Sequence, residues 1–376
     1  MSIHILHITR DYPPHYKGGI STAVLGMTRA LTARGVKVSI ISFDGWRPKS
    51  QTLSDAPLQH ETQGAVSIGR LHAPSQLESA HCFACELAPT HIHVHHDMLW
   101  AFARRVREQT KAPAYLTVHV LQKMMNQVRG VQEETLSLRA QEEAFREADL
   151  IFSPSNTTTE DLLELYPDLP RRIRTTPLGH YPSPLDPCAT TRDSHLTILF
   201  VGRFDTVKGT HLLFDAMASL SPRLPDIHWK VVGGIPGNPK GEKRWRRKWT
   251  ERAAPGWNVS LSGWLPPTEL HTLYKQSDIL IAPSLYETFG LSVLEAMSHG
   301  LGICAFNAGG LQDLLLHQEC ALLSQSGDTD SLHEHIETMV KNINLRRTLG
   351  QNASHRARTL FHWDQVIEKL LDAYGA

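Results

Sequence analysis

The chain has 376 residues, 41% of them hydrophobic, which is enough for two hydrophobic cores because one domain usually takes about 100–200 residues. Its 38 basic side chains balance its 38 acidic ones, so the overall charge gives no reason to expect nucleic acid as a partner. The N-terminus lacks the features of a signal peptide and no stretch approaches the roughly 18 apolar residues of a membrane span, so we expect a cytoplasmic protein, or one peripheral at the inner membrane.

Residues 3–43 predict a βαβ unit. An apolar strand at 3–8 is followed by a polar loop, a helix from about 21 to 33, and a second strand at 36–43. Gly18 and Gly19 lie just before the helix, where backbone amides and the helix dipole can meet a phosphate or a sugar. A plain packing turn is the alternative interpretation of this glycine pair.

Five cysteines and a run of histidines raise the question of a metal site. Cys82 and Cys85 form a CxxC pair inside residues 44–87, a region where we expect short strands, and neither a strand nor a thioredoxin-like context directly precedes the pair. No second ligand pair has a reliable spacing, so we expect reduced structural thiols rather than zinc or redox chemistry. The segment HIHVHHD predicts a strand with His91, His93 and His95 on one face. Metal binding and a strand that leads into the mouth of a site both remain open, and we favour the second.

A strand at 114–118 ends at His119. Ligands of open parallel sheets bind at the carboxyl ends of the strands, so His119 is expected to point toward a cleft between domains, with a purely structural histidine as the alternative. Residues 120–130 are both apolar and basic; we expect a loop that forms a partly buried lid or a helix start, and contact with an acceptor or a lipid surface is the alternative. Helices at 98–110, at 132–147 and after the capping residues Ser155 and Asn156 complete the N-terminal half of the chain. Its remaining strands are expected at 92–94, 149–153 and 173–176.

A proline-rich segment at 177–193 predicts a linker between two domains. The second domain begins with a strand at 196–201, and Arg203 and Lys208 flank the turn that leads into an amphipathic helix. Two cations and a helix N-terminus can together hold a diphosphate, in place of a metal.

The segment 240–252 follows a strand at 229–232 and carries seven basic and two acidic residues. Trp245 and Trp249 are spaced for one face of a helix. Amphipathic docking on a membrane is one interpretation, and we favour the other, a solvated helix anchored by the two tryptophans. A short strand at 259–261 then leads into a turn at Gly263.

Two carboxylates lie on adjoining elements between residues 279 and 310. A buried strand at 279–282 ends at a loop that carries Glu287, and a helix at 292–298 carries Glu295. Carboxylates at the carboxyl edge of a parallel sheet suit sugar hydroxyls, which need firm acceptors. Gly309 and Gly310 follow the next apolar run, where bare backbone amides can approach an anion.

The sequence PSLYETFGLSVLEAMSHG, followed by NAGG, resembles the E-x7-E signature of the retaining glycosyltransferases of family 4. The fold class that this resemblance implies is α/β of the GT-B type, in which two Rossmann-like domains with parallel sheets face each other across an inter-domain cleft. It further implies transfer of a hexose-type sugar from a nucleotide diphosphate sugar, most commonly a UDP-sugar, to a glycan, a lipid-linked molecule or a small molecule. No metal and no cofactor are expected.

The resemblance also implies roles for individual residues. Glu295 would bind the nucleotide ribose, Glu287 the hydroxyls of the donor sugar, and His119 the donor sugar as well. The GR-x4-KG element matches at Arg203 and Lys208, the glycine loop facing the donor matches at Gly18 and Gly19, and the turn that seats the base matches at Gly263. We therefore predict as catalytic Glu287, His119, Arg203 and Lys208, and as donor-binding Gly18, Gly19, Arg203, Lys208, Gly263, Glu295, Gly309 and Gly310.

The predicted domains are an acceptor-binding domain at 1–180 plus 360–376 and a nucleotide-sugar-binding domain at 181–359. Helices are expected at 332–339, with Asp330 or Ser331 as N-cap, and at 352–359. The final segment resembles the family's last helix, which crosses back to the first domain, and Trp363 would anchor it.

The chain departs from the family pattern in two places. Leu178 to Tyr181 replace an Asn-Gly-Val-Asp type of turn, and Asp313 replaces a glutamate. Two other functions remain possible: a GT-B sugar-nucleotide epimerase, for which the first domain lacks the expected carboxylates, and an inactive sugar-nucleotide-binding relative, which the intact site residues argue against.

Overall fold

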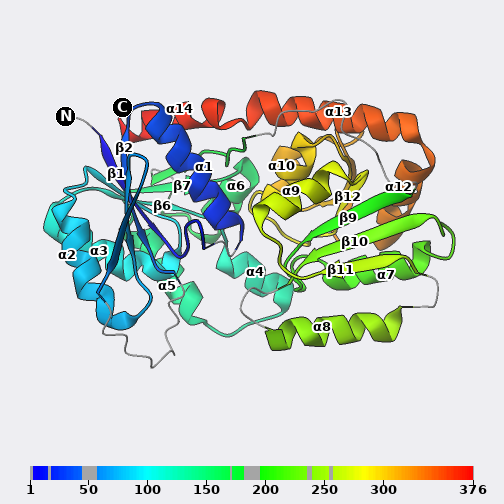
Figure 1. The fold of residues 1–376 in the computed structure, drawn as a ribbon, viewed down its shortest axis with the longest axis horizontal. Coiled ribbons are helices and arrows are strands. Elements are labelled where there is room, and N and C mark those ends of the chain that lie inside the picture. Colours follow the sequence, from blue (N-terminus) through cyan, green and yellow to red (C-terminus); the bar gives the residue numbers. More distant parts are fainter. Residues whose placement is uncertain are drawn as a thin grey trace. The chain divides into compact units, whose positions relative to one another are not determined.

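The computed structural model describes residues 3–15, 18–44, 57–169, 172–181, 195–234, 239–253 and 257–375. These residues form two compact units, shown as a ribbon in Figure 1. The N-terminal unit comprises Met1–Lys123, Gln132–Gly179 and Trp363–Ala376, and the C-terminal unit comprises Met124–Val131 and His180–His362. Most of the linker predicted at 177–193 lies outside the described residues.

The N-terminal unit is built on an eight-stranded sheet with the order β3-β4-β2-β1-β5-β6-β7-β8. Its strands pair in parallel except β3 and β4, which are antiparallel at one edge. All six residues of β1 are buried, as is usual for a central strand of a parallel sheet. The strands are β1 (His4–Thr9), β2 (Lys37–Ser42), β3 (Gln59–Gln63), β4 (Val66–Arg70), β5 (His91–Val94), β6 (Ala114–Thr117), β7 (Leu150–Ser153) and β8 (Ile173–Thr175).

The helices of this unit are α1 (Gly19–Ala33), α2 (Leu77–Glu86), α3 (Trp100–Thr110), α5 (Leu136–Glu147), α6 (Asn156–Leu165) and α14 (Trp363–Tyr374). Ser155 caps α6 as predicted, because its hydroxyl accepts from the amide of Thr158. Helix α5 starts later than predicted, at Leu136, because the side chain of Thr135 accepts from the amide of Leu138. Helix α2 lies in a region where only short strands were predicted, and it carries the CxxC pair.

Trp363 anchors the last helix on the N-terminal unit, as predicted. Its side chain is 2% exposed. A Cβ atom on Gly26 of α1 would lie 2.0 Å from the indole nitrogen of Trp363, and one on Gly179 would lie 2.4 Å from its ring. Both positions therefore require glycine, because the indole occupies the space that a side chain would need.

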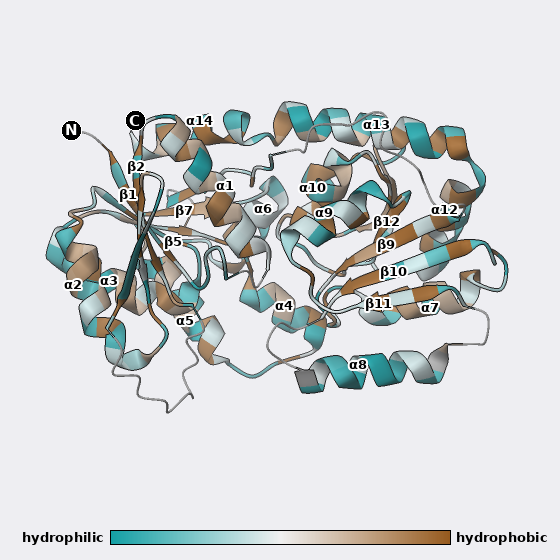
Figure 2. Ribbon diagram, in the orientation of Figure 1, coloured by the Kyte–Doolittle hydropathy of each residue, from teal (hydrophilic) through white to brown (hydrophobic). Residues whose placement is uncertain are grey.

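The C-terminal unit is built on a six-stranded sheet of parallel strands in the order β11-β10-β9-β12-β13-β14. Its hydrophobic core includes Phe200, Leu213 and Trp229. The strands are β9 (Leu196–Gly202), β10 (Ile227–Gly233), β11 (Val259–Ser262), β12 (Ile279–Ala282), β13 (Gly302–Asn307) and β14 (Leu322–Gln325). Figure 2 shows hydrophobic residues along these strands, whereas helix α8 is mostly hydrophilic.

The helices assigned mainly to this unit are α4 (Gln122–Arg129), α7 (Thr210–Leu220), α8 (Pro239–Arg252), α9 (Pro267–Lys275), α10 (Leu291–Ser298), α11 (Leu311–Leu314), α12 (Thr329–Lys341) and α13 (Ile343–Leu360). Helix α4 lies in the segment predicted as a lid loop or helix start. The N-cap predicted for α12 was wrong: Asp328 accepts from the amide of Ser331, so the helix starts at Thr329. Helix α13 starts well before the predicted residue 352. Within the described ranges, no helix is long and apolar enough to cross a bilayer.

Candidate active site

Lys208 and Glu287 form an ion pair in the C-terminal unit. They lie in the loops that follow β9 and β12, which are neighbours in the sheet. The side chains are 20% and 11% exposed, so the pair is largely shielded from water, where an ion pair depends on good geometry. Ser284 also donates to the same carboxylate oxygen, at 2.8 Å. The predicted diphosphate-binding cation and the predicted sugar-binding carboxylate are thus in direct contact.

Gly209 holds the two loops together. Its φ of +62° lies in the left-handed region, and a Cβ atom there would lie 1.7 Å from the carbonyl oxygen of Pro283. The amide of Leu285 donates to the carbonyl of Val207 at 2.8 Å. Gly209, the last residue of the GR-x4-KG element, is therefore required at this position. A larger residue would prevent the close approach of the loop that carries Lys208 to the loop that carries Glu287.

The glycine pair at 309 and 310 supports the backbone of Glu287. Gly309 has a φ of +53°, and a Cβ atom on it would lie 2.2 Å from the carbonyl oxygen of Glu287. The amide of Gly310 donates to this same oxygen at 2.7 Å. The amide of Gly310 is therefore bonded to Glu287 and not bare, which corrects that part of the prediction. The donor-binding roles of Gly309 and Gly310 stay predictions.

Asp205 organises the cations of the loop after β9, and we did not predict it. Its Oδ1 accepts from the backbone amide of Lys208 at 3.0 Å. Its Oδ2 lies 3.7 Å from Arg203 and 3.2 Å from Arg129 of α4. The side chain of Arg203 is 47% exposed, so it is only loosely paired and keeps much of its guanidinium in contact with solvent. An acidic residue inside the GR-x4-KG element was the only signal in the sequence.

Glu295 lies on α10, as predicted, and contacts a tyrosine that we did not predict. The hydroxyl of Tyr274, on α9, donates to Oε2 of Glu295 at 2.9 Å. Burial raises the pKa of the Glu295 carboxyl to about 7. This carboxyl therefore changes its charge near neutral pH, although it is predicted to bind a ribose.

Gly263 lies in the turn after β11, beside helix α8. Its carbonyl accepts from the amide of Gly233 at 3.2 Å, and a Cβ atom on it would lie 2.9 Å from Oε1 of Glu242. Glu242 pairs with Arg246 one helical turn away. The first turns of α8 thus border the turn predicted to seat the base.

The two tryptophans of α8 face inward. Trp249 is 6% exposed, and its ring centroid lies 4.2 Å from that of Phe214; the ring of Trp245 lies 6.0 Å from Phe214. This packing supports the favoured interpretation of a helix anchored by two tryptophans. Amphipathic membrane docking, the alternative, would need an exposed apolar face on α8. That face instead packs in the core.

His119 is half-buried and lies at the end of a cluster of buried histidines in the N-terminal unit. Its Nε2 lies 3.2 Å from Nδ1 of His95, and Nε2 of His95 lies 2.9 Å from Nδ1 of His7. Burial lowers the pKa of His7 and of His119 to about 3 and places that of His95 well below its usual value. These rings are neutral at pH 7 and are suited to hydrogen bonding rather than to binding an anion by charge.

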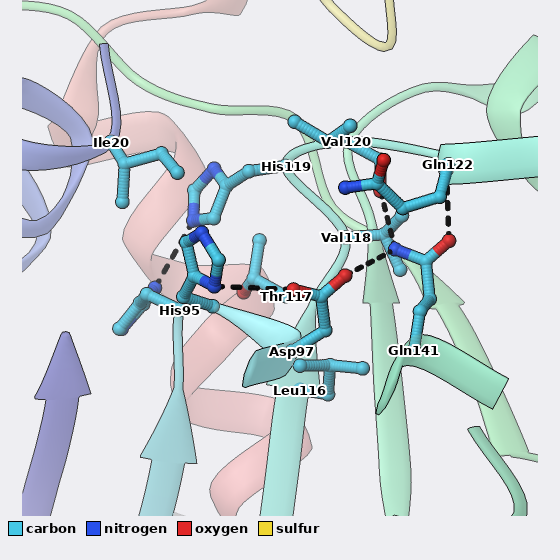
Figure 3. A pocket seen from close by; sticks show the side chains of 11 residues that line it. Ile20, His95, Asp97, Leu116, Thr117, Val118, His119, Val120, Gln122 and Gln141 are labelled. Atoms are coloured by element: carbon cyan, nitrogen blue, oxygen red, sulfur yellow. Dashed lines mark hydrogen bonds and ion pairs between the residues drawn. The ribbon is translucent and has the colours of Figure 1, made fainter. Parts of the chain in front are cut away.

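A small pocket lies beside His119, at the carboxyl ends of β5 and β6 (Figure 3). Gln141 holds one wall together, because its amide nitrogen donates to Asp97 at 2.9 Å and to the carbonyl of Val120 at 2.7 Å. Ile20, in the first turn of α1, lines the same pocket. Just before it, Gly18 has open space where a side chain would be. Gly18 and Gly19 therefore lie close in sequence to a residue of the pocket that His119 lines.

The histidines also include a possible metal group. Nitrogen atoms of His7, His93 and His95 lie within 4.8 Å of one another. Hydrogen bonds account for most of these nitrogens: both of His95 contact other histidines, and those of His93 contact Thr117 and Tyr374. The arrangement supports the interpretation of the histidine run as a strand that leads into a site, and metal independence stays a prediction.

The CxxC pair lies on α2, where both thiols are free. Sγ of Cys85 lies 3.7 Å from Nε2 of His81, and burial raises the pKa of the Cys85 thiol. A protonated thiol is a poor metal ligand and a poor nucleophile. The surroundings of Cys85 support the expectation of a reduced structural thiol, and for the exposed Cys82 it stays a prediction.

Comparison with known proteins agrees with the fold and with the resemblance. Residues 17–182 match the family described as Glycosyltransferase Family 4, and residues 189–356 match the one described as Glycosyl transferases group 1. The chain is 28% identical to the D-inositol 3-phosphate glycosyltransferase of Stackebrandtia nassauensis, over 95% of this chain and 86% of that protein.

Solved structures with a similar fold include sucrose-phosphate synthase from Thermosynechococcus elongatus, with a TM-score of 0.82, 23% identity and coverage of 99% and 98% of the two chains. HepE from Anabaena in complex with UDP-glucose gives a TM-score of 0.75, 18% identity and coverage of 99% of each chain. The predicted GT-B fold class, with two Rossmann-like domains built on parallel sheets, is confirmed.

Proposed function

We propose that this chain, which belongs to glycosyltransferase family 4, is a retaining enzyme that moves a hexose-type sugar from a nucleotide diphosphate sugar to an acceptor, without a metal. That it is a glycosyltransferase follows from its family. The observation that supports the finer proposal is the contact between Lys208 and Glu287. It brings together a cation suited to a diphosphate and a carboxylate suited to the sugar, at the carboxyl ends of two adjacent strands.

The proposed division of labour follows from the charges. The bond between the anomeric carbon and the phosphate oxygen breaks, so negative charge grows on the diphosphate and positive charge on the sugar. Lys208 and Arg203 stabilise the leaving diphosphate, and Glu287 stabilises the sugar. Glu295 holds the ribose and His119 contacts the donor sugar, while Gly18, Gly19, Gly263 and Gly309 let the backbone approach the donor.

We favour a UDP-sugar as the donor. Support comes from relatives in fold, since HepE has been crystallised with UDP-glucose and an Escherichia coli trehalose-6-phosphate enzyme with UDP-2-fluoro glucose. For the acceptor, the relatives named D-inositol 3-phosphate glycosyltransferases make a phosphorylated cyclitol the first small molecule to test. A glycan or a lipid-linked acceptor would be tested next.

The test begins with a thermal-shift screen of UDP, GDP and ADP. The correct nucleotide at about 100 times its dissociation constant should stabilise the protein by about 2.7 kcal/mol. The sugar nucleotide with that base, labelled in the sugar, is then incubated with and without acceptors. Transfer with retained configuration supports the proposal. Formation of an epimeric sugar nucleotide would favour the epimerase alternative, and binding without turnover of any acceptor would favour an inactive relative.

A further inference from the structure

Three imidazoles stand in series in the N-terminal unit. His7 lies on β1, His95 directly follows β5, and His119 follows β6 by two residues; these three strands are consecutive in the sheet. The N···N distances of 2.9 Å and 3.2 Å are both within hydrogen-bonding range. His7 and His95 are completely buried, so solvent does not compete for the bond between them, whereas the bond to His119 is partly buried.

The number of protons on the three rings restricts which tautomers His7, His95 and His119 can adopt together. A neutral imidazole carries one N–H, on either Nδ1 or Nε2. Each of the two contacts needs one proton, because two N–H groups would repel each other and two lone pairs would form no bond. If His7 carries its proton on Nδ1, it donates to Nε2 of His95, which must then carry its own proton on Nδ1 and donate to Nε2 of His119. His119 is then also protonated on Nδ1.

The opposite direction gives the opposite result for all three rings. If His119 donates from Nε2, then His95 and His7 are also protonated on Nε2. Mixed arrangements break one of the two hydrogen bonds and leave a buried polar atom unpaired, which costs about 1–3 kcal/mol. We propose that His7 and His95 are positioning residues that fix the tautomer of His119, so that all three rings carry the proton on the same ring position and change only together.

The function of this series follows from the pocket that His119 lines. With one Nε2 contact fixed by His95, the common tautomer decides whether Nδ1 of His119 donates or accepts a hydrogen bond. This consequence rests on the proposed function: the tautomer would fix whether His119 offers a hydrogen-bond donor or an acceptor to the donor sugar. His7, which lies on the far side of His95, therefore acts on the site through two hydrogen bonds. The titratable groups around His119 include His93, His95 and His96, and Asp97 lines the same pocket.

Nitrogen NMR tests the proposal on the protein without substrate. Histidine labelled with ¹⁵N distinguishes the protonated from the unprotonated ring nitrogen, and single substitutions assign the signals. The expected result at pH 7 is one common tautomer for His7, His95 and His119. Different tautomers in any two of them, or a positively charged ring, would overturn the proposal. So would shifts of the His7 and His95 signals on addition of zinc to chelator-treated protein, which would point to the metal group instead.

Substitution of His7 gives the second readout. His7→Phe keeps a buried ring but removes the first hydrogen bond, so His95 and His119 should each show both tautomers. His93→Phe is the matched control, because His93 is buried in the same cluster but bonds Thr117 and Tyr374; it should leave the tautomers of His95 and His119 unchanged. If His7→Phe does not fold, the wild-type spectrum alone decides.

The transfer assay separates this proposal from the proposed function. His7→Phe should lower kcat and leave the KM for the donor unchanged, because the ring does not touch the donor. An unchanged kcat would show that the tautomer does not matter for the reaction. If the wild-type protein transfers no sugar, the proposed function fails while the NMR result stands.

Discussion

The hydroxyl of Tyr274 donates to the carboxyl of Glu295 across the space between helices α9 and α10. Because burial raises the pKa of this carboxyl from 4.5 to about 7, the folded protein holds its proton more tightly than the unfolded chain does. Glu295 therefore contributes stability that is fully present below about pH 4.5 and is lost as the pH rises toward 7. Well above pH 7 the contribution of Glu295 to the free energy of unfolding no longer changes with pH.

The first prediction concerns Glu295→Gln, which keeps the shape of the side chain but removes the titration. The melting temperature of the variant relative to the wild type should rise from pH 5 to pH 7 and then level off. Affinity of the wild type for the nucleotide should increase over the same range, since the ionised carboxylate is the better acceptor for ribose hydroxyls. Glu251→Gln, an exposed change on α8, serves as the control. A constant difference in melting temperature from pH 5 to 8 would contradict the raised pKa.

The second prediction concerns Gly209. Replacement by alanine would place a Cβ atom on the carbonyl oxygen of Pro283 in a backbone conformation that L residues rarely adopt. Gly327→Ala is a matched control in the same unit, because Gly327 also has a positive φ but has open space around it. The control should reduce the free energy of unfolding by about 1–2 kcal/mol, and Gly209→Ala should reduce it clearly more. Urea unfolding measures both, and equal costs would show that the two loops are not held together as described.

The third prediction concerns the anchoring of α8. Trp249→Ala removes a large side chain from the core and should reduce the free energy of unfolding by about 3–5 kcal/mol. Lys243→Ala, on the exposed side of the same helix, should change it by less than about 0.5 kcal/mol. Chemical denaturation gives the stability. If Trp249→Ala were neutral for stability but reduced binding to lipid vesicles, the tryptophan would face a membrane instead.

The fourth prediction is that sugar transfer proceeds in an excess of EDTA. Arg203 and Lys208 supply the positive charge that a metal would otherwise bring to the diphosphate, and they lie at the end of β9 beside the N-terminus of α7. Initial rates before and after chelation are compared. Loss of turnover in EDTA that manganese restores would contradict this and would direct attention to His7, His93 and His95.

The sequence predicted the elements of the site better than their contacts. Strands β9 and β12 were predictable because short apolar runs end at glycine or proline, and the two glutamates follow β12 at a characteristic spacing. The series from His119 to His7 was not, because its contacts join residues 24 and 88 positions apart. Tyr274 was also missed, because its contact with Glu295 joins residues 21 positions apart, and Asp205 was missed although it lies inside the GR-x4-KG element. The bond between the amide of Gly310 and the carbonyl of Glu287 was not predictable, because a backbone hydrogen bond cannot be read from sequence spacing.

The last prediction separates the two glutamates. Glu287 contacts Lys208 and is proposed to face a sugar on which positive charge grows during the reaction. Glu287→Gln should therefore lower kcat by on the order of 10²-fold, the scale of one electrostatic contact aimed at a transition state, while free UDP still binds normally. Glu295 is proposed to hold a ribose whose charge does not change, so Glu295→Gln should mainly raise the KM for the donor.

Steady-state kinetics with the donor and calorimetry with UDP measure the two effects. Both variants have nearly the same shape as the wild type, and their melting temperatures must be compared at one pH because Glu295 titrates near neutrality. Lys208→Ala is the reference for a residue that acts in both the ground state and the transition state. The variant should weaken donor binding and also slow turnover, because Lys208 is proposed to contact the diphosphate, whose charge grows as the bond breaks. Full turnover in Glu287→Gln, together with abolished turnover and normal UDP affinity in Glu295→Gln, would reverse the assigned roles.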